Sequence, residues 1–530
     1  MTVAAVETPV VVIGAGPVGQ TTALLLARWG VPVVLLEARA SRELAGSRSI
    51  CQQRDVLDVW AHVGAEAIAE EGVTWTTART YYRDRELFAW SFADRGRSPL
   101  PPFVNISQSR TEELLDRRIA AEPLISVRWN REVTALEQDA STVTARCADG
   151  SAFIGTHAVL CAGARAGGLR EALGVGFPGE SFADRFLICD LRASLPGWET
   201  ERRFYFDPVW NPGRQVLIHP CPDSSYRIDW QVPPDFDLAA EEASGGLDRR
   251  IRQVLGARPY ELIWHSVYRF HSRLADRMAV GRVLLAGDAA HLVAPFGARG
   301  LNSGVPDAEN AAWKIAFARL GWGAPGLPDT YHAERHPAAL ENLEVTAATM
   351  RFLAPQTDAE RTHRREVLEK SAADPALAPA VDSGRFAEPY WYVDSPLTTP
   401  DPSRVFAGRP PKGQAATPGP GLIVPDAPVT VPGRPEVTRL RQVLRGGLTV
   451  LVPAPGDVAG VRTVLRGLGP VPSAAYVLSD LDPDGLLTEA LEARPGEAWL
   501  IRPDAHVAAV LPANDPEALR AAAHRALGLT

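Results

Sequence analysis

The sequence has few cysteines, no long apolar run and no excess of positive charge. Its five cysteines include no pair at CxxC spacing, which argues against disulfides and thiolate metal sites and fits a reducing compartment. No stretch approaches the roughly 18 apolar residues that a membrane span needs, and the N-terminus does not have the pattern of a signal peptide. The net charge is −8. We therefore expect a cytoplasmic protein with no metal, no membrane partner and no nucleic-acid partner.

Two GxGxxG patterns are present, and only the first has a suitable context. Its glycines follow an apolar run and open a segment of helical periodicity: Gly14, Gly16 and Gly19. A second apolar run ends in Glu37, 18 residues past the last of these glycines. This is close to the spacing of the acid that accepts hydrogen bonds from ribose hydroxyls in dinucleotide sites. The match at 174–179 precedes no helical segment and is discarded. A carboxylate at position 37 favours FAD or NAD over NADP.

A second glycine-rich turn, within residues 284–304, follows an apolar strand that ends at Asp288. An NAD dehydrogenase does not need such a turn, whereas a dinucleotide with a long redox head does. Asp288 is suited to accept hydrogen bonds from ribityl hydroxyls. Four residues would bring backbone to an isoalloxazine ring, the last two with N–H groups at a helix start: Gly297, Gly300, Leu301 and Asn302.

Together these segments resemble the class A flavoprotein aromatic hydroxylases, which have the p-hydroxybenzoate hydroxylase fold. The motifs that carry the resemblance occur in family order: GAGPVG at 14–19, Glu37 with Arg39, 47–64, 108–115, 281–291 and 295–316. The resemblance implies an FAD site formed by Gly14, Gly16, Pro17, Gly19, Glu37, Arg39, Arg48, Gln108, Asp288, Pro295, Gly297, Gly300, Leu301 and Asn302.

The chain departs from the family at two places. Ala162 and Ala166 stand where the family has an aspartate and a serine that are linked to FAD and the nicotinamide cofactor. An alanine side chain accepts no hydrogen bond, so the reductant and its affinity are in question. The family's GQG turn contains Arg299 instead of glutamine. Two interpretations are open for Arg299: an anion-binding residue near the flavin or substrate, or a solvated loop residue.

We expect an α/β protein: a Rossmann-like FAD-binding domain, an inserted antiparallel-sheet substrate domain and a C-terminal thioredoxin-like domain. The predicted boundaries are 1–74 with 105–180 and 276–345 for FAD, 75–104 with 181–275 for the substrate sheet, 346–395 for helices, 396–433 for a linker and 434–530 for the last domain. All cysteines precede residue 222, so this last domain has no CxxC and no dithiol chemistry.

Alternation in the predicted sheet gives two candidate faces. One is apolar: Val216, Ile218, Tyr226, Ile228 and Trp230. The other is more polar and includes Gln231. By comparison with the family, this polar face would contact the substrate through His219, Cys221, Arg227 and Asp229, with Pro295 opposite. His219 is the one candidate base, and no covalent nucleophile is evident.

A histidine pair, His332 and His336, has helical i, i+4 spacing but is not an HExxH motif, and we expect no metal there. The family's YxxERxP helix accounts for the surrounding residues: Tyr331, Glu334, Arg335 and Pro337.

The resemblance implies an FAD-dependent monooxygenase that hydroxylates an electron-rich aromatic substrate, a phenol or hydroxypyridine. NADPH or NADH would act as a transient reductant, and O2 would react through a flavin C4a-hydroperoxide. A role in antibiotic or aromatic catabolic metabolism would suit this subtype, and a homo-oligomer is left open. Two alternatives remain: a flavin oxidase or dehydrogenase on the same fold, and a non-catalytic flavin-binding scaffold, suggested by Ala162 and Ala166.

Overall fold

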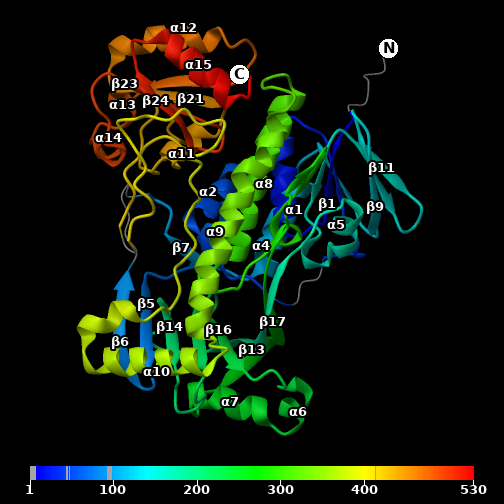
Figure 1. Cartoon of the computed structure of the whole chain (residues 1–530), viewed down its shortest axis with the longest axis vertical. Coiled ribbons are helices and arrows are strands. Elements are labelled where there is room, and N and C mark those ends of the chain that lie inside the picture. Colours follow the sequence, from blue (N-terminus) through cyan, green and yellow to red (C-terminus); the bar gives the residue numbers. More distant parts are fainter. Residues whose placement is uncertain (1–7, 43–45, 47, 92–97, 412–413, 530) are drawn as a thin grey trace.

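The computed structural model describes residues 8–42, 46, 48–91, 98–411 and 414–529. Figure 1 shows three parts along the long axis of the molecule. A C-terminal module lies at the top, a parallel sheet with its helices lies in the middle, and a large sheet covered by two helices lies at the bottom.

The central sheet has the strand order β18-β19-β12-β1-β2-β8. Its strands are β1 (Val10–Ile13), β2 (Val33–Leu36), β8 (Ile125–Arg128), β12 (Ala158–Leu160), β18 (Ala279–Val280) and β19 (Val283–Leu285). All neighbours run parallel except the edge strand β18. The short Val, Ile and Leu runs of the four central strands, β19, β12, β1 and β2, are almost entirely buried, as expected for a sheet covered on both faces. The prediction of a Rossmann-like domain is confirmed.

Helices and two small sheets surround this core. The helices are α1 (Pro17–Arg28), α2 (Arg54–His62), α3 (Ala67–Glu71), α4 (Gln108–Ala120), α5 (Gly167–Ala172) and α8 (Arg299–Arg319). One small sheet contains β3 (Cys51–Gln53), β4 (Val73–Thr74) and β7 (Phe103–Asn105), and the other contains β9 (Val133–Gln138), β10 (Val143–Cys147) and β11 (Ala152–Gly155).

The large sheet has the strand order β20-β17-β13-β16-β15-β14-β5-β6. Its strands are β5 (Thr77–Tyr82), β6 (Arg85–Ser91), β13 (Gly179–Ala193), β14 (Glu201–Phe206), β15 (Gln215–Cys221), β16 (Ser225–Val232), β17 (Tyr260–Leu274) and β20 (His291–Leu292). It is antiparallel as predicted except at one place, where β5 pairs parallel with β14. The β5–β6 hairpin comes from a much earlier part of the chain, and strand patterns in a sequence do not specify relative direction.

The two faces of this sheet have different neighbours. The apolar face named above packs against α7 (Gly246–Leu255), next to α6 (Leu238–Ala243). The opposite face packs at its apolar end against Phe296, which lies in the second glycine-rich turn. It also meets the end of α9 (Thr330–Leu353), close to α10 (Asp358–Ala373).

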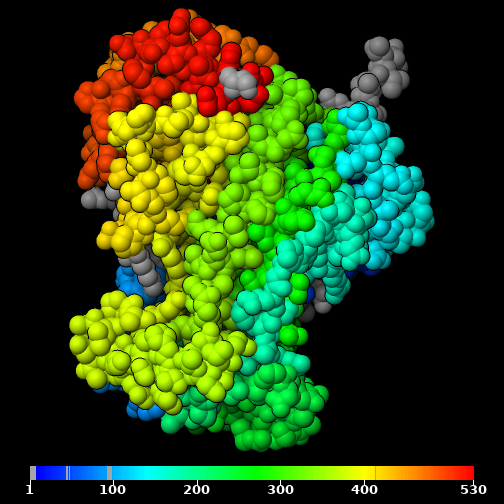
Figure 2. Space-filling view, in the orientation of Figure 1, coloured from blue at the N-terminus to red at the C-terminus, as the bar shows by residue number. Residues whose placement is uncertain are grey.

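Residues 396–433 are predicted as a linker, and the described ones, 396–411 and 414–433, contain no regular helix or strand. They are nevertheless packed: Val424 and Ala427 are fully buried. Figure 2 shows this part of the chain, in yellow, lying between the C-terminal module and the helices of the middle part. The segment is therefore part of the packed structure.

The C-terminal module has the sheet order β22-β21-β23-β24, with β22 parallel to β21 and the other neighbours antiparallel. Its elements are α11 (Leu440–Leu444), β21 (Leu448–Val452), α12 (Val458–Arg466), β22 (Ser473–Val477), α13 (Leu478–Leu481), α14 (Leu486–Leu491), β23 (Glu497–Ile501), β24 (Val507–Pro512) and α15 (Pro516–Ala526). This is the thioredoxin-like arrangement that the sequence predicts. Trp313 and Phe317 of α8 belong to its hydrophobic core.

Candidate functional site: two glycine-rich turns beside a polar sheet face

The first glycine-rich turn joins β1 to α1. Two of its glycines are required by close packing within the protein, and the third borders open space. Gly14 has φ +103°, and a Cβ on it would lie 2.4 Å from the Cys161 carbonyl oxygen. A Cβ on Gly19 would lie 1.9 Å from the Gly14 oxygen. Both are required by protein packing. A Cβ on Gly16 would have no neighbour within 4 Å, so space is open beside the N-terminus of α1, which starts at Pro17. A helix N-terminus bordering open space suits a pyrophosphate.

Glu37 follows β2 and is only 7% exposed. Its carboxylate accepts hydrogen bonds from the Ala15 N–H at 2.9 Å and from the Arg39 backbone and Nε at 3.0 and 2.9 Å. Burial alone would raise the pKa of Glu37, but these hydrogen bonds hold it below its usual value. The carboxylate is thus ionised and fixed next to the turn, ready to accept hydrogen bonds from ribose hydroxyls.

Arg42 is a site residue that the sequence did not indicate. Its Nη1 donates to the Ala15 carbonyl at 2.6 Å, and its Nε donates to Asp116 on α4 at 2.7 Å. It also pairs with Glu112 at 3.0 Å. The guanidinium therefore ties the first turn to α4. No local pattern signals this role, because the acidic partners lie 70 or more residues away.

Gln108 and Arg48 lie in two segments that are joined by a hydrogen bond. Gln108 begins α4, and its Oε1 accepts from the Ser49 N–H at 3.1 Å, so it holds the segment next to Arg48. Arg48 is exposed, with its guanidinium carbon 6.0 Å from the ring centre of Tyr268. Its cationic group is free to approach a bound cofactor.

Asp288 lies directly after β19, in the second glycine-rich turn. Its side chain is exposed and makes no hydrogen bond or ion pair with any residue that the structure describes. Dense surrounding protein nonetheless raises the pKa of the Asp288 carboxyl, and this effect is only partly opposed by His291 and Arg48. An accessible carboxylate without a protein partner is suited to bind ligand hydroxyls.

A buried hydrogen-bond network around Asp307 fixes the backbone next to Asp288. The Asp307 carboxylate, which is 0% exposed, accepts from the Gly287 N–H at 2.9 Å and from Arg335 Nε at 2.7 Å. His291 Nε2 lies 2.7 Å from the same carboxylate. Burial would raise the pKa of Asp307, but Arg335 and His291 hold it below its usual value. The YxxERxP motif identified Arg335, whereas nothing local identified Asp307 or His291.

The turn at residues 295–298 leads into α8. Pro295 is exposed, and Gly297 has φ +85°. A Cβ on Gly297 would lie 2.1 Å from the Arg385 carbonyl oxygen, whereas one on Gly300 would have no neighbour within 4 Å. Gly297 is thus already explained by protein packing, and Gly300 borders open space.

Asn302 and Leu301 lie in the first turn of α8. The Asn302 side chain, 4% exposed, accepts from the Gln53 N–H at 3.0 Å and donates to the Cys51 carbonyl at 2.9 Å. It therefore fixes α8 against β3. The N–H groups of residues 300–302 point out of the helix end, where they are available to an electron-rich ligand atom.

Arg299 fits neither interpretation offered by the sequence. It is 2% exposed and donates to Asn342 at 2.5 Å and to the carbonyls of Arg385 and Phe386 at 3.2 and 3.0 Å. Both interpretations, a solvated residue and an anion-binding residue at the mouth of the site, are therefore wrong. The side chain instead anchors the 385–386 segment.

The altered family motif keeps one structural contact. Ala162 precedes a short 3-10 turn, and Ala166 is buried at 1% exposure. Arg170, 6% exposed, donates to the carbonyl of Ala289, the residue after Asp288, at 3.0 Å. It also lies 3.9 Å from the ring centre of Phe177. This arginine supports the second turn without the missing polar side chains.

The histidine pair has a structural contact. His332 Nδ1 accepts from the Met278 N–H at 3.2 Å, and the two rings of His332 and His336 lie 4.8 Å apart. Nearby, Tyr331 donates to the Leu285 carbonyl at 2.7 Å.

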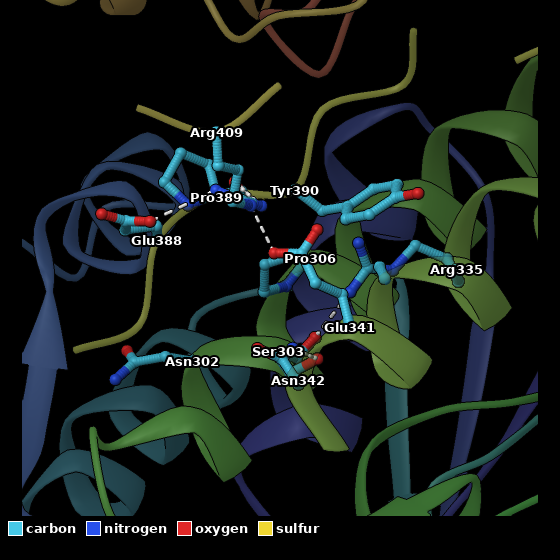
Figure 3. Close-up of a pocket in the computed structure, with 11 residues that line it drawn as sticks. Asn302, Ser303, Pro306, Arg335, Glu341, Asn342, Glu388, Pro389, Tyr390 and Arg409 are labelled. Atoms are coloured by element: carbon cyan, nitrogen blue, oxygen red, sulfur yellow. Dashed lines mark hydrogen bonds and ion pairs between the residues drawn. The ribbon is translucent and has the colours of Figure 1, made fainter. Parts of the chain in front are cut away.

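A small cavity lies behind the first turn of α8 (Figure 3). Its volume is about 20 Å³, enough for a water molecule and far too small for a flavin. Asn302 and Ser303 line one side, and Arg409 closes the other through ion pairs with Glu341 and Glu388. The cavity is therefore not itself the flavin site.

The polar face of the large sheet is buried and rich in charge. His219 is 9% exposed, and burial, with Arg202 and Arg227 nearby, holds its pKa well below the usual value. Its Nε2 lies 3.7 Å from Asp229. Burial raises the pKa of Asp229 to about 7. Neutral His219 and the easily protonated Asp229 are thus neighbours.

The rest of this face lies against the FAD part. Arg227 pairs with Asp190 at 2.7 Å and donates to the Arg48 carbonyl at 3.3 Å. Cys221 packs in one cluster with Cys51 and Ala298, and burial raises the pKa of the Cys221 thiol to about 12. The thiol is therefore not a nucleophile. The side-chain amide of Gln231 donates a hydrogen bond to Asp184 within the sheet.

Comparison with known proteins identifies the family. The family model described as FAD binding domain matches residues 7–346. The chain belongs to this family and is an enzyme of the class A FAD-dependent aromatic hydroxylases and monooxygenases, with FAD as cofactor.

Individual relatives extend the match along the chain. Rifampicin monooxygenase of Streptomyces venezuelae is 32% identical over 362 residues, 67% of this chain and 74% of that protein. A probable NADH-specific resorcinol 4-hydroxylase of Rhodococcus jostii is 27% identical over 522 residues, 94% of this chain and 91% of that protein. The flavin-dependent monooxygenase PieE, solved with FAD and substrate, has the same fold: TM-score 0.84, 23% identity, 99% of this chain and all of that one.

The described part of the chain has no helix with the length and apolar character needed to cross a membrane.

Proposed function

We propose that this enzyme uses NADPH or NADH and O2 to hydroxylate an electron-rich aromatic substrate of the phenol or hydroxypyridine type. The observation that carries the proposal is that two glycine-rich turns follow neighbouring parallel strands, and that the second turn, which leads into α8, packs through Ala298 against Cys221 of the polar sheet face. The names of two relatives support the substrate class, since they specify resorcinol and 3-(3-hydroxy-phenyl)propionate. A cytoplasmic location and a homo-oligomer are further proposals from the sequence.

We infer the following roles toward FAD from the positions of the residues described above. Glu37 accepts hydrogen bonds from the ribose, while the N-terminus of α1 faces the pyrophosphate. Asp288 accepts hydrogen bonds from the ribityl chain. The N–H groups of Leu301 and Asn302 stabilise negative charge on the ring. When bound, FAD supplies the transfer of electrons from the nicotinamide to O2 and the activation of oxygen.

The sheet would place the substrate ring and exclude water. His219 is neutral, and its Nδ1 has no hydrogen-bond partner among the described residues, so it is free to accept a hydrogen bond from a substrate hydroxyl. Asp229 lies 3.7 Å from Nε2, and a proton passed to His219 would be stabilised by this carboxylate. Deprotonation of a phenol makes its ring more electron-rich and so favours attack by an electrophilic oxygen.

The test is NADPH and NADH oxidation by the FAD-loaded protein, with and without resorcinol, 3-(3-hydroxyphenyl)propionate and 3-hydroxypyridine. We expect faster oxidation with at least one compound, and a product that carries one oxygen from labelled O2. Flavin reduction by the aromatic compound alone under anaerobic conditions would support the oxidase alternative instead. A flavin that neither nicotinamide reduces would support the scaffold.

A further inference from the structure

Arg202 occupies a central place on the polar face of the large sheet. It lies on β14 and is 4% exposed. In the sheet register the next residue, Arg203, pairs with Ile218, which places Arg202 beside His219 on the neighbouring strand. The two side chains interact electrostatically, because Arg202 contributes to the low pKa of His219. Arg202 is therefore in the row of side chains that would face the substrate.

The other buried arginines described here have polar partners. Arg227 and Arg335 pair with carboxylates. Arg170 and Arg299, which have no carboxylate partner, donate to backbone carbonyls. Arg202 makes neither a hydrogen bond nor an ion pair with any residue that the structure describes, and its Nε is buried without a partner. Burial lowers the pKa of Arg202, and the carboxyl group of Asp229 opposes this effect but is not in contact with it. An unpaired buried cation is costly, so its retention calls for a functional reason.

Two aromatic rings hold the guanidinium in place. Its carbon lies 5.0 Å from the ring centre of Phe386 and 5.4 Å from that of Phe204. Ring contacts of this kind leave the N–H donors at the guanidinium edge free for hydrogen bonds. Burial lowers the pKa of Arg202 to about 10, so it remains a cation at neutral pH.

This position is also close to the N-terminus of α8. The side chain of Cys51 lies near Arg202, and the Cys51 carbonyl accepts from Asn302 in the first turn of α8. An aromatic ring between the sheet and this helix end would lie within reach of the guanidinium.

We propose that Arg202 is a specificity-determining residue that binds an anionic oxygen of the aromatic substrate. This inference rests on the proposed function, because it assumes that the sheet face binds the substrate. The anionic oxygen has two possible sources, a carboxylate substituent or the phenolate formed from a ring hydroxyl. Both match the planar, charged donors of a guanidinium.

The test compares binding to Arg202→Met with binding to Arg203→Met. Arg203 is a matched control, since it lies next along the same strand but pairs with Glu201 at 3.0 Å and contacts Trp198 on the other face. The oxidised, FAD-loaded proteins are titrated calorimetrically with 3-(3-hydroxyphenyl)propionate and with its uncharged amide, over a range of pH.

If Arg202 binds the carboxylate, the wild type binds the acid more tightly than the amide. Arg202→Met then weakens binding of the acid by roughly 10- to 100-fold. If the phenolate is bound, acid and amide bind alike and tighten as pH rises toward about 10, the usual pKa of a phenol such as tyrosine. Arg202→Met then abolishes this pH dependence. Unchanged binding in Arg202→Met, an equal loss in Arg203→Met, or no binding of either compound to the wild type overturns the proposal.

Thermal unfolding of the FAD-free protein separates binding from a structural role. Because the variant removes an unpaired buried charge, Arg202→Met should unfold at the same or a higher temperature than the wild type. Arg202→Gln provides a second uncharged variant with the same expected loss of binding. If neither variant folds, Arg202 is structural and the proposal fails. These measurements need no NAD(P)H or O2, so a failure of the hydroxylation assay would leave their result unaffected.

Discussion

The side-chain carboxylate of Asp307 accepts a hydrogen bond from the backbone N–H of Gly287, the residue that precedes Asp288. The same carboxylate pairs with Arg335 and His291. A residue on α8 thus fixes the turn that presents Asp288 to the groove.

Asp307→Asn should weaken FAD retention. The amide oxygen can still accept from Gly287, but Arg335 loses its charge partner, and breaking a buried pair costs about 3–5 kcal/mol. We expect a lower flavin-to-protein ratio after gel filtration and a lower unfolding temperature. Asp276→Asn, at an exposed pair with Arg277, is the control and should change neither.

Asp288→Ala should weaken FAD retention without destabilising the FAD-free protein. The carboxylate has no hydrogen-bond partner among the described residues, and the dense protein around it already raises its pKa. Titration of the apoprotein with FAD and thermal unfolding without FAD measure the two effects. Normal flavin occupancy in the variant would contradict the ribityl role.

Gly300→Ala and Gly297→Ala should have opposite effects on stability. Alanine at 300 lies in a helix and meets no neighbour within 4 Å, so the apoprotein should gain roughly 0.5–1 kcal/mol. Residue 297 has a positive φ, and the Cβ of an alanine there would collide with the Arg385 carbonyl, so Gly297→Ala should destabilise the apoprotein. Urea unfolding distinguishes them. If the ring lies against Gly300, that variant also binds FAD less tightly, and unchanged affinity would argue against this contact.

Much of the site could be predicted because its signals are local. The first turn has glycines at fixed spacing after a strand, and the second has a strand that ends in Asp288. The partners that fix these turns were missed, because Arg42 reaches carboxylates on α4 and Asp307 reaches Arg335 on α9. Such pairs join distant segments and leave no periodic pattern. The orientation of Arg299 was missed for the same reason, since its partners lie at 342 and 385–386.

Asp58→Asn should destabilise the junction between α2 and the C-terminal module. Asp58 is 1% exposed and pairs with Arg439 at 2.8 Å and with Arg445. Burial would raise its pKa, but these arginines hold it low. Loss of the charge leaves buried cations uncompensated, at a cost of about 3–5 kcal/mol in denaturant unfolding. Asp248→Asn, at the exposed pair with Arg252, should have little effect.

Buried histidines should make stability fall as the pH drops below about 6.5. Burial lowers the pKa of His157 to about 4, with Arg282 and Arg319 adding to the effect. Between about pH 4 and 6.5 the unfolded chain therefore binds a proton that the folded chain does not, which favours unfolding. His157→Gln should reduce the dependence of the unfolding free energy on pH between about 7 and 5. His524→Gln on α15 is the control, and an identical slope in His157→Gln would contradict the assignment.

Helix α8 begins at the second glycine-rich turn and reaches the core of the C-terminal module, through Asn302 and Trp313. At 1.5 Å per residue, this helix of 21 residues spans about 30 Å and continues through Pro306, which lacks the N–H for one helical hydrogen bond. The C-terminal module is therefore not an independent cassette for protein engineering. A chimaera that exchanges it with a relative would have to retain the apolar surface that receives Trp313 and Phe317 and the arginines that meet Asp58. Otherwise the C-terminal half of α8 would lose its packing partner. Because the first turn of the same helix lies at the proposed flavin site, weaker flavin binding would be the first measurable defect.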